Sequence, residues 1–193
     1  EGANILTRTL MIFGQGAIRC HPHVLKEVHA IESNDLAAFD TAFWAHIAHV
    51  LRNFIRMILL YLSRGHLSFP GYSGKLRRSL QKLTWASTGF AFFTDLILGT
   101  LGGGLKLKGN ITGRFGDILS WLYLCTCSIR RYIAEGEQKD DWIYVEWIMA
   151  YGLYQIQIAF EGILSNMGVV FKPVLWLARL SPFSEPPSDK MNT

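Results

Sequence analysis

The fold is decided by residues 33–61, whose sequence is SNDLAAFDTAFWAHIAHVLRNFIRMILLY. The run Ser33-Asn34-Asp35 is a strong helix-start signal, because such short polar side chains accept hydrogen bonds from the first free backbone N–H groups. Apolar residues then recur at steps of three and four, the spacing of one helix face. The stretch therefore predicts a helix ending at Tyr61, with a buried stripe formed by Phe39, Phe43, His46, Ile47, Val50, Phe54 and Ile58.

The rest of the chain carries the same helical pattern. No segment shows the alternation of a β-strand, so we predict an all-α fold, an antiparallel helical bundle with no sheet. Asn110 is expected to cap one helix, and Gly136 to end it. The sequence predicts a loop over 64–74, a break at Gly102-Gly103-Gly104, and helices over residues 3–18, 23–31, 75–101, 112–134, 140–166 and 173–180.

Composition bounds the class of protein. The 193 residues, half of them hydrophobic, suffice for one core and argue against disorder. A net charge of +4 suits an anionic ligand or an acidic membrane surface, but the basic clusters are short, so no nucleic-acid partner is predicted. Three cysteines without framework spacing favour a reducing compartment. The apolar run from Leu83 to Leu105 contains Asp95 and several glycines, which favours a buried helix over a membrane span.

The histidines are weighed as metal ligands and set aside. Cys20, His21 and His23 lie around Pro22, but zinc needs four converging ligands and the sequence offers no obvious fourth. We therefore predict no metal site there, only a turn between helices with partly exposed imidazoles. His46 and His49 share a helix face, and without a Glu-x-x-His pair we expect them to be packed or hydrogen-bonded.

A basic and aromatic group in the first half has two interpretations. It comprises Arg52, Arg56, Lys75, Arg77, Arg78 and Lys82, with Trp44, Phe69, Tyr72 and Trp85 nearby in the sequence. Such cations usually form a solvated face, but aromatic neighbours also suit an anionic lipid surface. Peripheral membrane contact therefore stays open.

Five stretches resemble a known enzyme family. Residues Glu1 to Arg8, EGANILTR, resemble the Glu-Gly-Thr-x-x-Ile-x-Arg segment of acyl-CoA dehydrogenases. Four others resemble the bacterial FadE-type fatty-acyl-CoA dehydrogenases, which carry an extra helical region. They are FGQGAIRCHP at 13–22, LGGGLK at 101–106, RFGDILS at 114–120 and PPSDK at 186–190.

The resemblance implies a flavin-dependent enzyme that introduces the α,β double bond into fatty acyl-CoA in β-oxidation. It makes Glu1 the catalytic base, which removes the α-proton of the thioester while the β-hydrogen leaves as hydride to FAD. Gly2 becomes a cofactor-binding residue, since a small residue lets the flavin ring approach. Ala3 and Ile5 lack the family's polar side chains, so no flavin contact is assigned to them.

The resemblance also implies the organisation of the chain. Residues 1–20 would end the dehydrogenase helical domain, 21–180 would form the FadE-type extension, and 181–193 a Pro-rich tail or linker. Because the chain begins at Glu1 without Met, we expect a C-terminal fragment that is inactive alone.

The implied partners are fatty acyl-CoA, an electron-accepting flavoprotein or quinone-linked acceptor, and a second copy in a homo-oligomer. The implied location is cytoplasmic, with the inner-membrane surface open. The alternative function is a non-catalytic helical module for membrane-surface docking or self-association.

Overall fold

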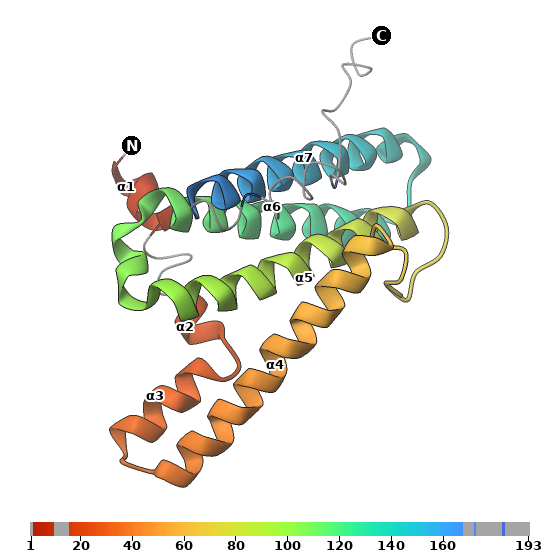
Figure 1. The fold of residues 1–193 in the computed structure, drawn as a ribbon. Helices are drawn as coiled ribbons and strands as arrows, with labels where there is room; N and C mark the ends of the chain where they lie inside the picture. The colour runs from red at the N-terminus through yellow and green to blue at the C-terminus, as the bar shows by residue number, and fades with distance from the viewer. Residues whose placement is uncertain (1, 10–15, 168–171, 173–182, 184–193) are drawn as a thin grey trace.

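Every regular element is helical in the computed structural model, which describes residues 2–9, 16–167, 172 and 183 (Figure 1). The predicted all-α fold is confirmed, with no strand in those residues. Residues 10–15 and 173–180 lie outside them, so the predicted helix 3–18 is seen only at its ends. The elements are α1 Gly2–Leu6, α2 Gly16–Cys20, α3 Val24–Glu32, α4 Leu36–Leu62, α5 Leu76–Leu101, α6 Gly109–Ala134 and α7 Trp142–Asn166, with 3₁₀ turns η2 Gly102–Leu107 and η3 Lys139–Asp141.

The core bundle consists of α5, α6 and α7, which lie side by side (Figure 1). The most extensive contact runs between α6 and α7. Gly152 of α7 permits their close approach, because a Cβ there would overlap the sulfur of Cys125 in α6. The largest fully buried side chains of this bundle are Leu76, Ile97, Phe115, Ile118, Ile129, Ile156 and Ile163.

The helix ends follow the sequence signals with one exception. Asp35 caps α4, its carboxylate accepting a hydrogen bond from the N–H of Ala38 at 2.9 Å. Gly136 adopts a φ of +84° just past α6, which glycine tolerates without strain. The predicted cap at Asn110 was wrong: α6 begins at Gly109, directly after η2, so Asn110 already lies in its first turn.

An arm formed by α3 and α4 projects from the core bundle (Figure 1). The predicted buried stripe of α4 was wrong in extent. Phe43, Ile47, Phe54 and Ile58 are all 38% exposed or more, and the buried residues of α4 are Ala42, Asn53 and Leu60. The reason is tertiary: α4 packs on α3 and against part of α5, and the described residues offer nothing to cover its outer face.

The apolar run from Leu83 to Leu105 forms most of α5 and part of η2. It is interrupted at Gly102, where φ is +48°. Many of its residues are buried, as predicted, including Asp95. Among the described helices, none has the length and apolar character needed to cross a membrane.

Candidate functional site

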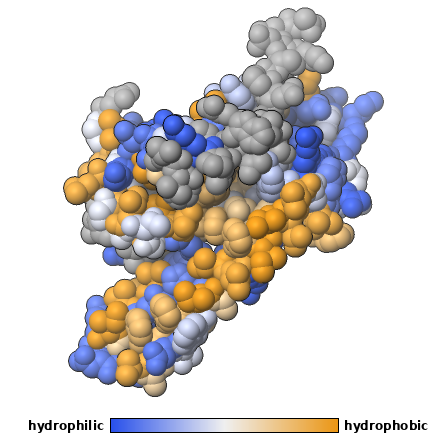
Figure 2. All heavy atoms as spheres, in the orientation of Figure 1, coloured by the Kyte–Doolittle hydropathy of each residue, from blue (hydrophilic) through white to orange (hydrophobic). Residues whose placement is uncertain are grey.

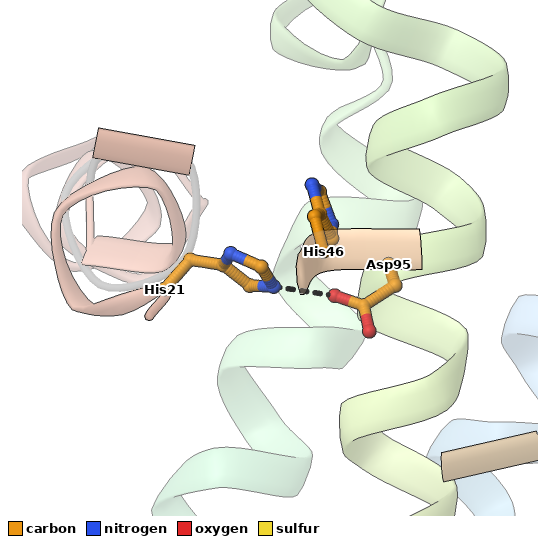
Figure 3. A group of neighbouring side chains, drawn as sticks. All are labelled: His21, His46 and Asp95. Carbon is orange, nitrogen blue, oxygen red and sulfur yellow. Dashed lines mark hydrogen bonds and ion pairs between the residues drawn. The ribbon is translucent and has the colours of Figure 1, made fainter. Parts of the chain in front are cut away.

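A group of imidazoles and carboxylates lies where the arm meets the core bundle. His21 precedes α3, His46 comes from α4 and Asp95 from α5, and their side chains converge (Figure 3). One ligand-type atom from each lies within 4.8 Å of the other two. The rings of His23 and His49 pack against the two histidines of this trio at centroid distances of 5.6 to 6.0 Å. We call the histidine–carboxylate cluster the set His21, His23, Glu27, His46, His49 and Asp95.

His21 connects the arm to the core bundle. Its Nε2 lies 2.8 Å from Asp95 Oδ1, and the two side chains are only 7% and 3% exposed. Its Nδ1 accepts hydrogen bonds from the backbone N–H groups of Val24 and His23, at 3.1 and 3.3 Å. An imidazole whose Nδ1 accepts carries its proton on Nε2, so His21 donates to Asp95. The predicted partial exposure of this ring was wrong, because α5 covers it.

His46 and His49 are held by other partners. The Nδ1 of His46 lies 2.8 Å from Glu27 Oε1, so the carboxylate fixes the ring proton on Nδ1 and leaves Nε2 as an acceptor. His49 contacts the side chains of Arg52 and Asn53 at 3.0 and 2.9 Å. The prediction of hydrogen-bonded histidines at these positions is confirmed.

Two of the histidines in the cluster have lowered pKa values, and one carboxylate oxygen has no donor from the described residues. Burial, then His21 and His46, lower the pKa of His23 against the opposing pull of Glu27. Burial also lowers the pKa of His49. A lowered pKa favours the neutral form of both rings. The Oδ2 atom of Asp95 is buried with no hydrogen-bond donor from the described residues.

A pocket of about 660 Å³ opens beside the cluster. Glu27, His46, Asp95 and Thr100 contribute its polar side chains, and most of the remainder consists of apolar side chains of α4 and α5. Gly102 and Leu105 of η2 close one side. This volume falls within the usual range of small-molecule sites, which are mostly apolar with a few polar groups.

Comparison with known proteins gives a family match. The sequence model of the family described as acyl-CoA dehydrogenase, C-terminal, bacterial type, matches residues 18–193. The chain belongs to this family. No solved structure matches the chain.

In this acyl-CoA dehydrogenase family member, the predicted base Glu1 lies outside the described residues. Gly2 is exposed, and nothing lies within 4 Å of where its Cβ would be. The segment 2–9 rests on α6 through an ion pair between Arg8 Nη1 and Asp117 Oδ1 at 3.3 Å. A Cβ on Gly116 would lie 2.7 Å from the carbonyl oxygen of Arg8. Two of the stretches that carried the resemblance, 1–8 and 114–120, are therefore in contact.

The ion pair under this segment is partly solvated. The side chains of Arg8 and Asp117 are 51% and 35% exposed. Burial raises the pKa of Asp117, while Arg8 and Arg114 pull it down. A pair of this exposure contributes well under about 1 kcal/mol, so the close backbone approach at Gly116 does more to position the segment.

Sequence reasoning missed the convergence of the cluster. It treated the pair His21 and His23 separately from His46 and His49, and it gave Asp95 no partner. A signal was present: a carboxylate in the middle of an apolar helix needs a donor, because burying it unpaired is costly. Cys20, the third member of the group weighed for metal, is exposed.

Proposed function

We propose that this chain is the helical C-terminal part of a flavin-dependent acyl-CoA dehydrogenase that introduces the α,β double bond into fatty acyl-CoA during β-oxidation. One observation carries the proposal: the family match over 18–193 occurs in a chain whose sequence has the family's Glu-Gly pattern at Glu1 and Gly2, and whose residues 2–9 rest on α6. The substrate is a fatty acyl-CoA. An electron-accepting flavoprotein or a quinone-linked acceptor takes the electrons.

Glu1 is the base of this reaction. The α-proton of a thioester is weakly acidic, so its removal is helped by a carboxylate whose pKa is raised toward the working pH by burial against the substrate. FAD is the cofactor of the full-length protein. The matched family model describes a C-terminal region, so we assign most of the flavin site to the remainder of the full-length protein. The contribution of this chain is the proton step.

Helix α6 orients the segment that carries the base. Residues 2–9 rest on α6 by the Arg8–Asp117 pair and by the close approach of backbone at Gly116. Because α6 belongs to the core bundle, its contacts hold residues 2–9 against that bundle. The bundle is in this sense a support for the active-site segment.

The decisive experiment is Glu1→Gln in the full-length protein. The amide keeps the size of the side chain but cannot take a proton, so we expect acyl-CoA oxidation to fall by at least about a hundredfold. Glu32→Gln is the matched control, since Glu32 is exposed on α3. Wild-type activity in the Glu1 variant, with the fold intact by circular dichroism, would place the base elsewhere.

A second experiment addresses the fragment alone. The purified 193-residue chain, mixed with FAD and a long-chain acyl-CoA, should not bleach the flavin absorbance. The full-length protein under the same conditions should bleach it. Substantial bleaching by the isolated chain would contradict the proposed division of the active site.

The alternative function, a helical docking module, is favoured by one feature of the arm. Six apolar residues recur along α4 at steps of three and four, each 38–74% exposed, and they form an exposed apolar row about 27 Å long. Figure 2 shows hydrophobic side chains gathered over α4. The row consists of Trp44, Ile47, Leu51, Ile55, Ile58 and Leu62.

The basic and aromatic group proposed for lipid contact is divided by the structure. Trp85 is 4% exposed, Tyr72 hydrogen-bonds Glu137, and the Lys75 ammonium lies 5.4 Å from the centre of the Trp142 ring. What remains together on α4 is the row itself with the exposed Arg52 and Arg56. Cations beside an apolar helix face are typical of helices that lie on anionic membranes.

Flotation with vesicles separates the two docking modes. Binding to vesicles containing phosphatidylglycerol that is lost in Arg52→Glu/Arg56→Glu supports membrane docking. A concentration-dependent dimer that is lost in Leu51→Ser/Ile55→Ser but kept in the arginine variant supports self-association. A protein that stays monomeric and binds to no vesicles contradicts both docking modes.

A further inference from the structure

We propose that His21, His46 and Asp95 form a binding site for a divalent metal ion of the zinc type. The proposal is independent of the dehydrogenase reaction, which uses none of these residues. Two imidazoles and a carboxylate are a frequent ligand set of zinc sites that keep a fourth position open. Here the three side chains come from three separate segments, and one ligand atom of each lies within 4.8 Å of the others (Figure 3).

Asp95 provides the observation that points to a bound cation. Its side chain is 3% exposed, one oxygen accepts from His21, and the other, Oδ2, has no donor from the described residues. A buried carboxylate oxygen is costly to leave without a donor or a cation. A metal ion bound through Oδ2 satisfies this atom without breaking a helix.

Glu27 acts on His46 as the outer partner that metal-bound histidines usually have. The carboxylate takes the Nδ1 hydrogen bond at 2.8 Å, which holds the ring and leaves the Nε2 lone pair free for the ion. His46 and Asp95 are therefore ready as ligands. Both line the 660 Å³ pocket, so the open coordination position, filled by water, faces that pocket.

His21 is the ligand that adjusts. Its Nε2 proton lies between the ring and Asp95, and Nδ1 accepts from the Val24 N–H. Coordination through Nε2 moves the ring proton to Nδ1, which turns the ring away from the start of α3. We therefore expect hydrogen exchange at the Val24 amide to become faster when the metal binds.

The experiment measures Zn²⁺ binding to the 193-residue chain after chelator treatment and buffer exchange. Isothermal titration should give one tight site per chain in the wild type. Glu27→Gln should weaken it by about 10- to 100-fold, as the loss of an outer partner does, and Asp95→Asn and His46→Ala should weaken it further. The double variant His29→Ala/His66→Ala is the matched control, because both histidines are exposed, and it should bind as tightly as the wild type.

Co²⁺ substitution in the wild type identifies the ligands even if a variant fails to fold. The proposed site gives the visible absorption of four-coordinate cobalt with nitrogen and oxygen donors. A thiolate-to-cobalt band that disappears in Cys20→Ser would instead place the ion on Cys20 and would overturn the proposal. The proposal is also overturned if the wild type binds no Zn²⁺, or if the His29→Ala/His66→Ala variant binds Zn²⁺ more weakly than the wild type.

Discussion

Helices α4 and α7 are nearly equal in length and both rich in apolar residues, yet far more of α7 is buried. Of the 25 residues of α7, ten are buried, whereas of the 27 residues of α4 three are. The difference lies in their neighbours: α7 packs along α6, while α4 contacts α3 and part of α5. Apolar periodicity therefore identifies a helix face, and only the packing decides whether that face is covered.

The junction between the two regions combines aromatic and polar contacts: the rings of Phe54 in α4 and Phe92 in α5 lie 5.3 Å apart, centroid to centroid. Inside the core bundle, Phe115 of α6 and Ile156 of α7 belong to one apolar cluster and have no exposed surface. The arm instead is tied to α5 in part by the bond between His21 and Asp95. Where the arm meets the bundle, a directional contact between buried polar groups therefore adds to the apolar packing.

The largest expected effect contrasts one substitution in each helix. Ile156→Ala in α7 removes a fully buried side chain and should lower the free energy of unfolding by about 2–5 kcal/mol. Leu51→Ala in the exposed row of α4 should change it by less than about 0.5 kcal/mol. Urea denaturation followed by circular dichroism measures both. Equal losses would mean that a second copy covers α4 in solution.

A smaller effect is expected at the junction. His21→Ala leaves the Asp95 carboxylate buried without its donor and removes the acceptor of the Val24 N–H at the start of α3, which should cost about 1–3 kcal/mol. Hydrogen exchange in metal-free buffer should quicken in α3 and α4 more than in α7. His29→Ala, at an exposed position on α3, should leave exchange unchanged. A uniform rise across all helices would show that arm and bundle unfold together.

The next prediction concerns the segment that leads to Glu1. Gly116→Ala places a Cβ about 2.7 Å from the carbonyl oxygen of Arg8, so residues 2–9 should detach from α6. Trypsin should then cut after Arg8 faster, while the bundle loses less than about 1 kcal/mol. Gly99→Ala is the control, since nothing lies within 4 Å of a Cβ at that site. Unchanged cleavage would mean that other contacts hold the segment.

The smallest expected effect is a difference in how fast the three cysteine thiols are alkylated, which involves no change in stability. Burial in α6 raises the pKa of the Cys125 thiol to about 11, so at pH 8 only about one part in a thousand is thiolate. Iodoacetamide should label the exposed Cys20 and Cys127 in the native protein, and Cys125 only after guanidinium is added. Mass spectrometry counts the labels. Three labels without denaturant would contradict the close packing of α6 on α7.

The sequence predicted the helices well where the deciding forces are local. Asp35 as a cap and Gly136 as a stop act through backbone geometry within one turn, so no partner was needed to read them. The cap prediction at Asn110 was wrong because the position of a cap also depends on the conformation of the preceding residues. Here η2 ends at Leu107 and α6 begins at Gly109, before Asn110. The family, too, was readable from short stretches that lie far apart in the chain.

Only the tertiary structure decided the meeting of distant groups. His21 and Asp95 are 74 positions apart, and their contact depends on how the arm leaves the bundle, which no periodicity encodes. The same holds for Arg8 on Gly116 and for the uncovered face of α4. The sequence by itself determined which segments are helical, because capping and amphipathic spacing are local. The tertiary structure decided which faces are buried and which polar groups meet, because these depend on long-range packing.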